Sequence, residues 1–183
     1  QIIFASQAES RLSRVSGAGG KVESLTTPDK AKEEYAHRQP CGLSSGQGIL
    51  FTIMRHAWDV RPRVAVLKLA TRQWRVLLEN AADARYIPTG HLAFLRQGTL
   101  LVVPFDLDRL ELTGQPVPAA ANISQALNTG GSDTAAGQFS ISDSGSLVYA
   151  SGGILPDRQN SLVWLDYEGK AEPIASFKAS SFC

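Results

Sequence analysis

The chain has 183 residues, of which 43% are hydrophobic and 19% are charged, so it is long enough to form one domain around a buried core. Its 18 Lys and Arg residues nearly balance its 17 Asp and Glu residues, and this balance argues against nucleic acid as a partner. The longest apolar runs, such as 99–105, have the length of a strand and fall far short of the roughly 20 residues of a membrane helix. We therefore expect no membrane contact from this segment.

Short apolar runs separated by Gly, Pro, Asn, Asp and Ser are typical of strands joined by turns. In chain order, the sequence predicts strands at 2–5, 11–15, 21–25, 48–53, 63–69, 74–78, 91–95, 99–104, 117–120, 138–142, 146–150, 161–166 and 171–174. One segment, 29–38, favours a helix, because Asp29 can cap a run of Lys, Ala and Glu residues. The predicted fold class is therefore all-β, with one short helix at a connection.

A short motif recurs along the chain: a glycine, then apolar residues, then an aromatic residue. Ile49 and Leu92 of this motif are 43 residues apart, and Leu92 and Leu147 are 55 residues apart. The longer step is explained by an insertion at 125–137, which is polar and rich in turn residues. We expect Leu50, Leu92 and Leu147 to occupy equivalent buried positions in successive repeats.

A period near 40–45 residues with four strands per repeat is typical of a β-propeller, whose blades are four-stranded antiparallel sheets. The chain is then a single domain, 1–183, with about four blades that form a partial or a small ring. The expected blades are 1–36, 37–84, 85–125 and 137–177.

Several segments also resemble a known family. The stretch from Asp83 to Leu92 (DARYIPTGHL), the segment 100–106 and the LTGQPV motif at 112–117 resemble bacterial TolB-like, WD-repeat-like propellers. They are similar in particular to the propellers that follow the kinase domain of bacterial receptor-type serine/threonine kinases. The resemblance implies a periplasmic or extracytoplasmic location. Kinase activity is not implied, because the kinase signatures are absent from the sequence.

Residues that could carry chemistry have a structural interpretation in each case. Ser44 lies in a G-x-S-x-G pattern at 42–46, but no strand-turn-helix context supports a nucleophile, so we expect a turn. The resemblance implies that His37 forms a hydrogen bond between blades. Asp106, Asp143 and Asp166 are expected to accept hydrogen bonds from backbone amides in turns rather than to bind calcium. We expect no catalytic residue, no metal and no cofactor.

Two loops are the candidate binding regions. The first carries Arg55, His56, Trp58 and Arg61, since exposed Trp and Arg are enriched at interaction surfaces, although a Trp at such a point is more often packed between blades. The second is the 125–137 insertion, with Asn128 and Asp133, where a ligand contact can be added without disturbing a sheet.

The sequence favours a non-catalytic propeller module that binds or senses a protein or a small ligand. Two alternatives remain open: a propeller-type enzyme such as a glycosidase or lyase, which needs converging carboxylates, and an inert propeller domain of a larger peptidase. Residues 1–90 carry a net charge of +5 and residues 91–183 a net charge of −4, so the two open ends of the fan should attract each other. They could do so within one chain, which would close a small ring, or between chains in a head-to-tail assembly, and we favour the assembly.

Overall fold

The computed structural model describes residues 1–6, 10–55, 61–127, 134–155, 163–165 and 167–173. These residues form strands, turns and one 3-10 turn, η1 (Lys30–Lys32), and all but one of the strand pairings are antiparallel. The expected all-β class is thereby confirmed. Within the same ranges, no helix is long and apolar enough to cross a membrane.

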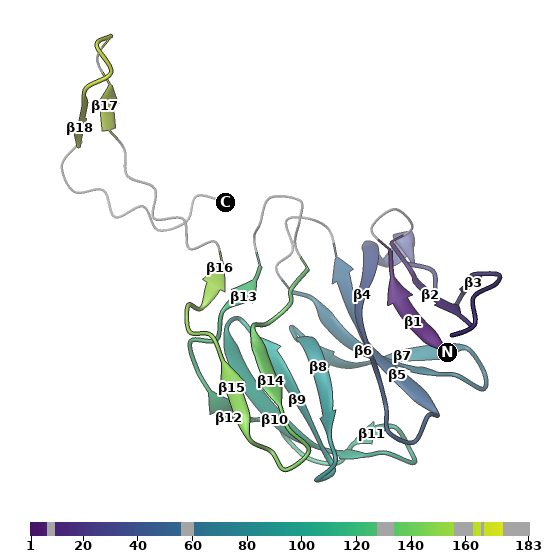
Figure 1. The fold of residues 1–183 in the computed structure, drawn as a ribbon. Helices are drawn as coiled ribbons and strands as arrows, with labels where there is room; N and C mark the ends of the chain where they lie inside the picture. The colour runs from purple at the N-terminus through teal and green to yellow at the C-terminus, as the bar shows by residue number, and fades with distance from the viewer. Residues whose placement is uncertain (7–9, 56–60, 128–133, 156–162, 166, 174–183) are drawn as a thin grey trace.

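Three larger sheets follow one another along the chain (Figure 1). The first contains β1 (Ile2–Ala5), β2 (Leu12–Val15) and β3 (Glu23–Ser24). The second contains β4 (Glu34–Gly42), β5 (Gly48–Arg55), β6 (Arg63–Lys68) and β7 (Gln73–Glu79). The third contains β8 (Ala82–Ile87), β9 (His91–Arg96) and β10 (Thr99–Asp106), with β11 (Glu111–Leu112) and β12 (Val117–Ala120) both paired to β10.

Three two-stranded pairings complete the described structure. The strand β14 (Phe139–Ile141) pairs with β15 (Leu147–Tyr149), and β17 (Val163–Leu165) pairs with β18 (Ala171–Pro173), in both cases antiparallel. The short strands β13 (Gln125–Ala126) and β16 (Ile154–Leu155) pair in parallel.

The helix expected at 29–38 is wrong beyond its first turn. Asp29 does cap it, since its carboxylate accepts the amide of Ala31 at 3.0 Å, but Glu33 has a φ of +60° and ends the turn. The chain then enters β4, which pairs with β5 and buries Ala36 and His37. Burial between two sheets outweighs the local helix preference of the Lys, Ala and Glu residues.

Apolar clusters hold consecutive sheets together face to face. Strand β5 shows how this works, because neighbouring residues of a strand point to opposite faces. Ile49 packs with Leu12 of the first sheet, whereas Leu50 packs with Leu92 of the third. The third sheet in turn packs through Leu95 on β14 and β15. Sheets that bury both faces and fan out in chain order, as Figure 1 shows, form a partial β-propeller.

The expected equivalence of Leu50, Leu92 and Leu147 is wrong by one residue. Leu92 and Leu147 pack toward the preceding sheet, whereas Leu50 packs toward the following one. The residue of β5 that packs toward its preceding sheet is Ile49. Leu92 and Leu147 come two residues after the glycine of the motif, and Ile49 only one, so counting from the glycine shifts the register.

A backbone hydrogen bond marks the same point in three successive repeats. In each repeat, a backbone amide at or just before the first strand donates to a backbone carbonyl of the preceding repeat. The successive donors are 44 and 42 residues apart in the sequence. The pairs are His37 with Ser10, Ala81 with Pro62, and Ile123 with Gly98, each at 2.8 Å.

The two ends of the 125–137 insertion lie side by side. Gln125 and Gly137 form a β-bridge, so the residues between them are an excursion from the repeat, which confirms the reason expected for the 55-residue step. At its base Leu127 and Ala135 are buried. They pack with Ala36, Met54 and Ala82 in what we call the axial apolar cluster, which joins the second sheet, the third sheet and the insertion. Three parts of the fan meet at this cluster, and we call this meeting point the axis.

Candidate functional site

The two loop regions predicted to bind a partner begin at the axial apolar cluster. Met54, the neighbour of Arg55, packs in this cluster with Leu127, the neighbour of Asn128. Arg55 itself is the last residue of β5, and its Nη2 lies 2.6 Å from Glu33 Oε2. Arg61 is exposed just before β6. The other four candidates, His56, Trp58, Asn128 and Asp133, lie outside the described residues.

Beside the axial apolar cluster lies a group of five polar side chains, which we call the axial polar cluster: Arg38, Gln39, Thr52, Asp83 and Arg85. Thr52 is its centre and is fully buried. Its hydroxyl donates to Gln39 Oε1 at 2.7 Å and accepts the backbone amide of Asp83 at 3.0 Å. The first bond links β4 to β5 within the second sheet, and the second connects that sheet to β8 of the third.

The Asp83 carboxylate is fully engaged within this cluster. Both its oxygens accept hydrogen bonds from Arg85, at 3.3 and 3.2 Å, and Oδ2 also accepts the amide of Gly137 at 2.8 Å. Arg85 in turn donates to the carbonyl of Phe139 at 2.6 Å and stacks 3.9 Å from the centre of that ring. Asp83 and Arg85 therefore fasten the returning end of the insertion to β8.

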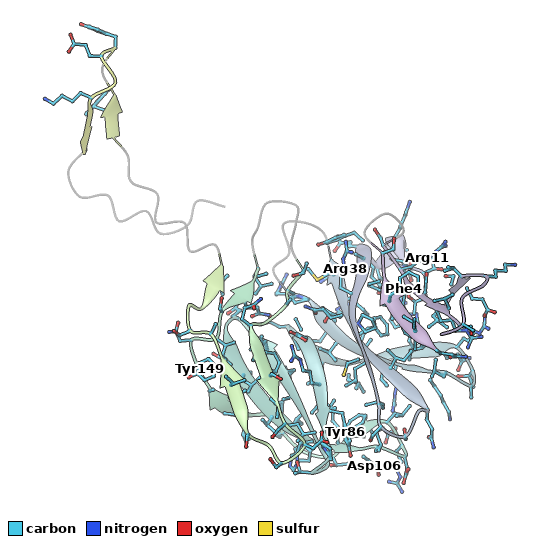
Figure 2. All side chains as sticks on the ribbon, viewed as in Figure 1. Phe4, Arg11, Arg38, Tyr86, Asp106 and Tyr149 are labelled. Carbon is cyan, nitrogen blue, oxygen red and sulfur yellow. The ribbon has the colours of Figure 1, made fainter. Side chains whose placement is uncertain are left out.

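Arg38 and Gln39 carry hydrogen-bond donors that lack an acceptor. Arg38 Nε and Gln39 Nε2 are both buried, and neither has a partner among the residues that the structure describes. Gln39 has a φ of +52°, and the pairing of β4 with β5 shifts register between Arg38 and Cys41. Figure 2 places Arg38 at the end of the fan opposite to Tyr86 and Asp106.

His37 occupies a second buried polar site, between the first and second sheets. Its ring is fully buried, with Nδ1 2.8 Å from Thr26 Oγ1 and Nε2 3.3 Å from Glu34 Oε2. Thr26 Oγ1 also accepts the amide of Leu12 in β2 at 3.1 Å, so the expected hydrogen bond between blades is confirmed. Burial lowers the pKa of His37 from its ordinary value of 6.5, an effect that the hydrogen bond and charge of Glu34 oppose.

The arrangement of hydroxyl, imidazole and carboxyl around His37 lacks the access that catalysis needs. The side chains of His37 and Glu34 are both 0% exposed, so no substrate reaches the ring. The ring packs on Phe51 and Trp74, with centroids at 4.9 and 5.5 Å. We assign this group to the packing of the first sheet on the second.

The turn interpretations of Ser44 and Asp106 are confirmed. Ser44 is exposed between β4 and β5, where the amide of Gly46 donates to the carbonyl of Leu43, and a strand follows where a nucleophile elbow needs a helix. A strand does precede this turn, which the sequence analysis did not foresee. Asp106 accepts the amides of Asp108 and Arg109, at 3.0 and 2.8 Å.

The other two predicted turn acids differ from Asp106. At the turn between β14 and β15, the Ser142 hydroxyl accepts the amide of Ser146 at 3.0 Å, the role that was expected of Asp143. Asp166 lies outside the described residues. The described part of the chain contains no group of three His, Cys, Asp or Glu side chains arranged to hold a metal ion.

A cleft of about 340 Å³ lies between the second and third sheets, away from the axis. Trp74 and Lys68 line one side, and the segment 108–111 lines the other. Arg75 crosses it, bound to Glu111 at 3.1 Å and to the carbonyl of Leu110 at 3.2 Å. Since Arg75 is already bound by the facing loop, this cleft is a weaker candidate than the axial polar cluster.

Comparisons with known proteins identify the fold. No protein family and no curated protein matches the sequence. Among solved structures, the chain is similar to TolB from Acinetobacter baumannii, with a TM-score of 0.54 and 16% sequence identity over 93% of this chain. The match covers 39% of the TolB chain, so this chain spans well under half of that protein's length. The chain thus has a TolB-like β-propeller fold in partial form.

The axial polar cluster was not predicted from the sequence, although the repeats contain a signal for it. Gln39, Asp83 and Gln125 each follow the repeated backbone hydrogen bond by two residues, and they are spaced 44 and 42 residues apart. Polar residues at a repeated interior position of a propeller blade indicate contacts between blades. Comparison of the repeats in correct register would have found them.

Proposed function

We propose that this chain is a non-catalytic binding module, in which the axial end of the blades binds a protein or a small ligand. The observation that carries the proposal is the pair of unpartnered donors on Arg38 and Gln39, at the point where the second sheet, the third sheet and the insertion meet. Buried donors are nearly always satisfied in folded proteins, so donors left free at the axis indicate a missing acceptor. The TolB-like fold supports the proposal by offering loops around such an axis.

An enzymatic role has less support. A glycosidase or lyase needs two or more carboxyl groups that converge on a substrate. Asp83 is the acidic member of the axial polar cluster, and Arg85 and Gly137 occupy both its oxygens. Elsewhere, His37 is inaccessible and Ser44 lies in a turn between two strands.

The wider setting of the module belongs to the proposal as well. The resemblance to propellers of receptor-type kinases rests on the sequence alone, whereas the similarity to TolB supports a TolB-like fold. A bacterial, periplasmic or extracytoplasmic protein fits the resemblance to TolB-like propellers. Head-to-tail association of copies, and an inert role in a larger peptidase, stay open.

The proposal is tested by measuring turnover. The wild-type chain and the variants Asp83→Asn and Ser44→Ala are assayed with chromogenic glycosides and esters, with the exposed Asp143→Asn as the matched control. We expect rates equal to those in buffer for all four proteins. Saturable turnover that falls in Asp83→Asn but not in Asp143→Asn would instead assign the axial cluster to catalysis.

A further inference from the structure

Arg38 differs from four other partly buried arginines of the described structure, and from Arg96, whose guanidinium donates to the carbonyls of Glu79 and Asn80. Arg14, Arg55, Arg63 and Arg85 each have a carboxylate within hydrogen-bond distance, supplied by Glu23, Glu33, Glu79 and Asp83. Arg38 is also partly buried, yet its Nε has no acceptor in the part of the chain that the structure describes. A buried N–H of a charged group without an acceptor is unfavourable, and an anion is the acceptor that best suits a guanidinium N–H.

Gln39 supplies a second donor at the same place. Arg38 pairs with Thr52 across the two strands, and cross-strand partners lie on the same face of a sheet. Gln39 reaches Thr52 as well, because its Oε1 accepts the Thr52 hydroxyl at 2.7 Å. Because the hydrogen bond to Thr52 fixes Oε1, the side-chain amide of Gln39 has a defined orientation. Its Nε2 can only donate, and it has no acceptor among the described residues. Arg38 and Gln39 therefore both neighbour the same threonine, Arg38 as its cross-strand partner and Gln39 through a hydrogen bond.

The surroundings favour a negatively charged ligand. Asp83, the nearby acid, is neutralised by Arg85 and hydrogen-bonded to the amide of Gly137. Ala36, two residues before Arg38 on the same face of β4, packs against the base of the insertion. The site thus lies at the axis, next to the insertion, with an unneutralised cation and an oriented amide donor.

We propose that Arg38 and Gln39 form a binding site for an oxyanion, the carboxylate or phosphate group of a ligand that binds at the axis. Both groups present oxygen acceptors that match the fork of a guanidinium and an adjacent amide N–H. This inference deepens the proposed function and rests on it. Turnover at Asp83 would overturn the proposed function, whereas absence of anion binding would overturn only the present inference.

Isothermal titration calorimetry tests the site with two probes, inorganic phosphate and acetate, in chloride at constant ionic strength. We expect saturable binding of at least one probe to the wild type, and the stronger probe tells a phosphate ligand from a carboxylate one. Arg38→Gln should weaken binding by about tenfold, the size expected for loss of a hydrogen bond to a charged group. Arg63→Gln is the matched control, because it removes an arginine that Glu79 already pairs, and it should bind like the wild type.

Thermal unfolding and circular dichroism establish that each variant is folded. Gln39→Asn is the second variant, since it keeps the charge of Arg38 and tolerates a positive φ while shortening the amide arm. It should also weaken binding. The inference is overturned if the wild type binds neither anion saturably, if Arg63→Gln weakens binding as much as Arg38→Gln, or if Gln39→Asn binds like the wild type.

Discussion

Replacement of His37 by alanine tests how the first sheet is held on the second. The substitution removes a fully buried ring and its contacts with Thr26 and Glu34, at 2.8 and 3.3 Å. Each lost hydrogen bond costs about 1 to 1.5 kcal/mol, and the void left by the imidazole adds about 1 to 2 kcal/mol. We therefore expect the free energy of unfolding to fall by about 3 to 5 kcal/mol, a large part of the about 5 to 15 kcal/mol of a typical domain.

Urea denaturation near neutral pH, followed by circular dichroism, measures this loss. His91→Ala is the matched control, because His91 is half-buried in β9 and its ring bonds only locally, to Thr89. It should change stability by less than about 0.5 kcal/mol. A loss below about 1 kcal/mol for His37→Ala would refute the reasoning, since a buried ring with two partners cannot be removed at so small a cost.

Three further predictions concern pH, packing and assembly. Burial lowers the pKa of His37 below 6.5, so at low pH the unfolded chain binds a proton at this residue more readily than the folded chain does. The free energy of unfolding should therefore decrease as the pH drops below 6.5. The variant His37→Gln should show a weaker pH dependence in urea titrations. Gly137→Ala should destabilise by about 1 to 3 kcal/mol, because an added Cβ would clash with Leu95, while Gly145→Ala, with open space around it, reports the cost of positive φ alone. If attraction between the positive half (1–90) and the negative half (91–183) drives association, light scattering should show oligomers that dissociate when salt is added. A monomer of 19.7 kDa at both low and high salt would contradict this.

The apolar runs allowed most of the sheet structure to be predicted. The strands β1 and β12 have the predicted bounds, and β5, β6, β7, β9 and β10 differ only at their ends. Among them, β5, β6, β9 and β10 are rich in Val, Ile, Leu and Phe, so their local pattern matches their buried environment.

Two strands that were not predicted, β4 and β8, have mixed or charged sequences. Strand β4 begins with Glu34 and contains His37, Arg38 and Pro40, which read locally as a helix followed by a loop. Its extended form depends on pairing with β5 and on the buried hydrogen bonds of Glu34 and His37. The local sequence of β4 predicts neither the pairing nor these hydrogen bonds. The same applies to the donors of Arg38 and Gln39, because a bulge with positive φ brings both beside Thr52.

The most direct test of the account is a map of where small molecules bind. Backbone amide shifts are recorded by NMR while a mixed library of acidic, basic and neutral fragments is titrated into the chain. The account predicts that the perturbed amides concentrate at the axial polar cluster, around Arg38, Gln39, Asp83 and the adjoining Gly137. Perturbations confined to the cleft beside Trp74 and Arg75, or spread evenly over the surface, would contradict the claim that this propeller binds its partner at the axis.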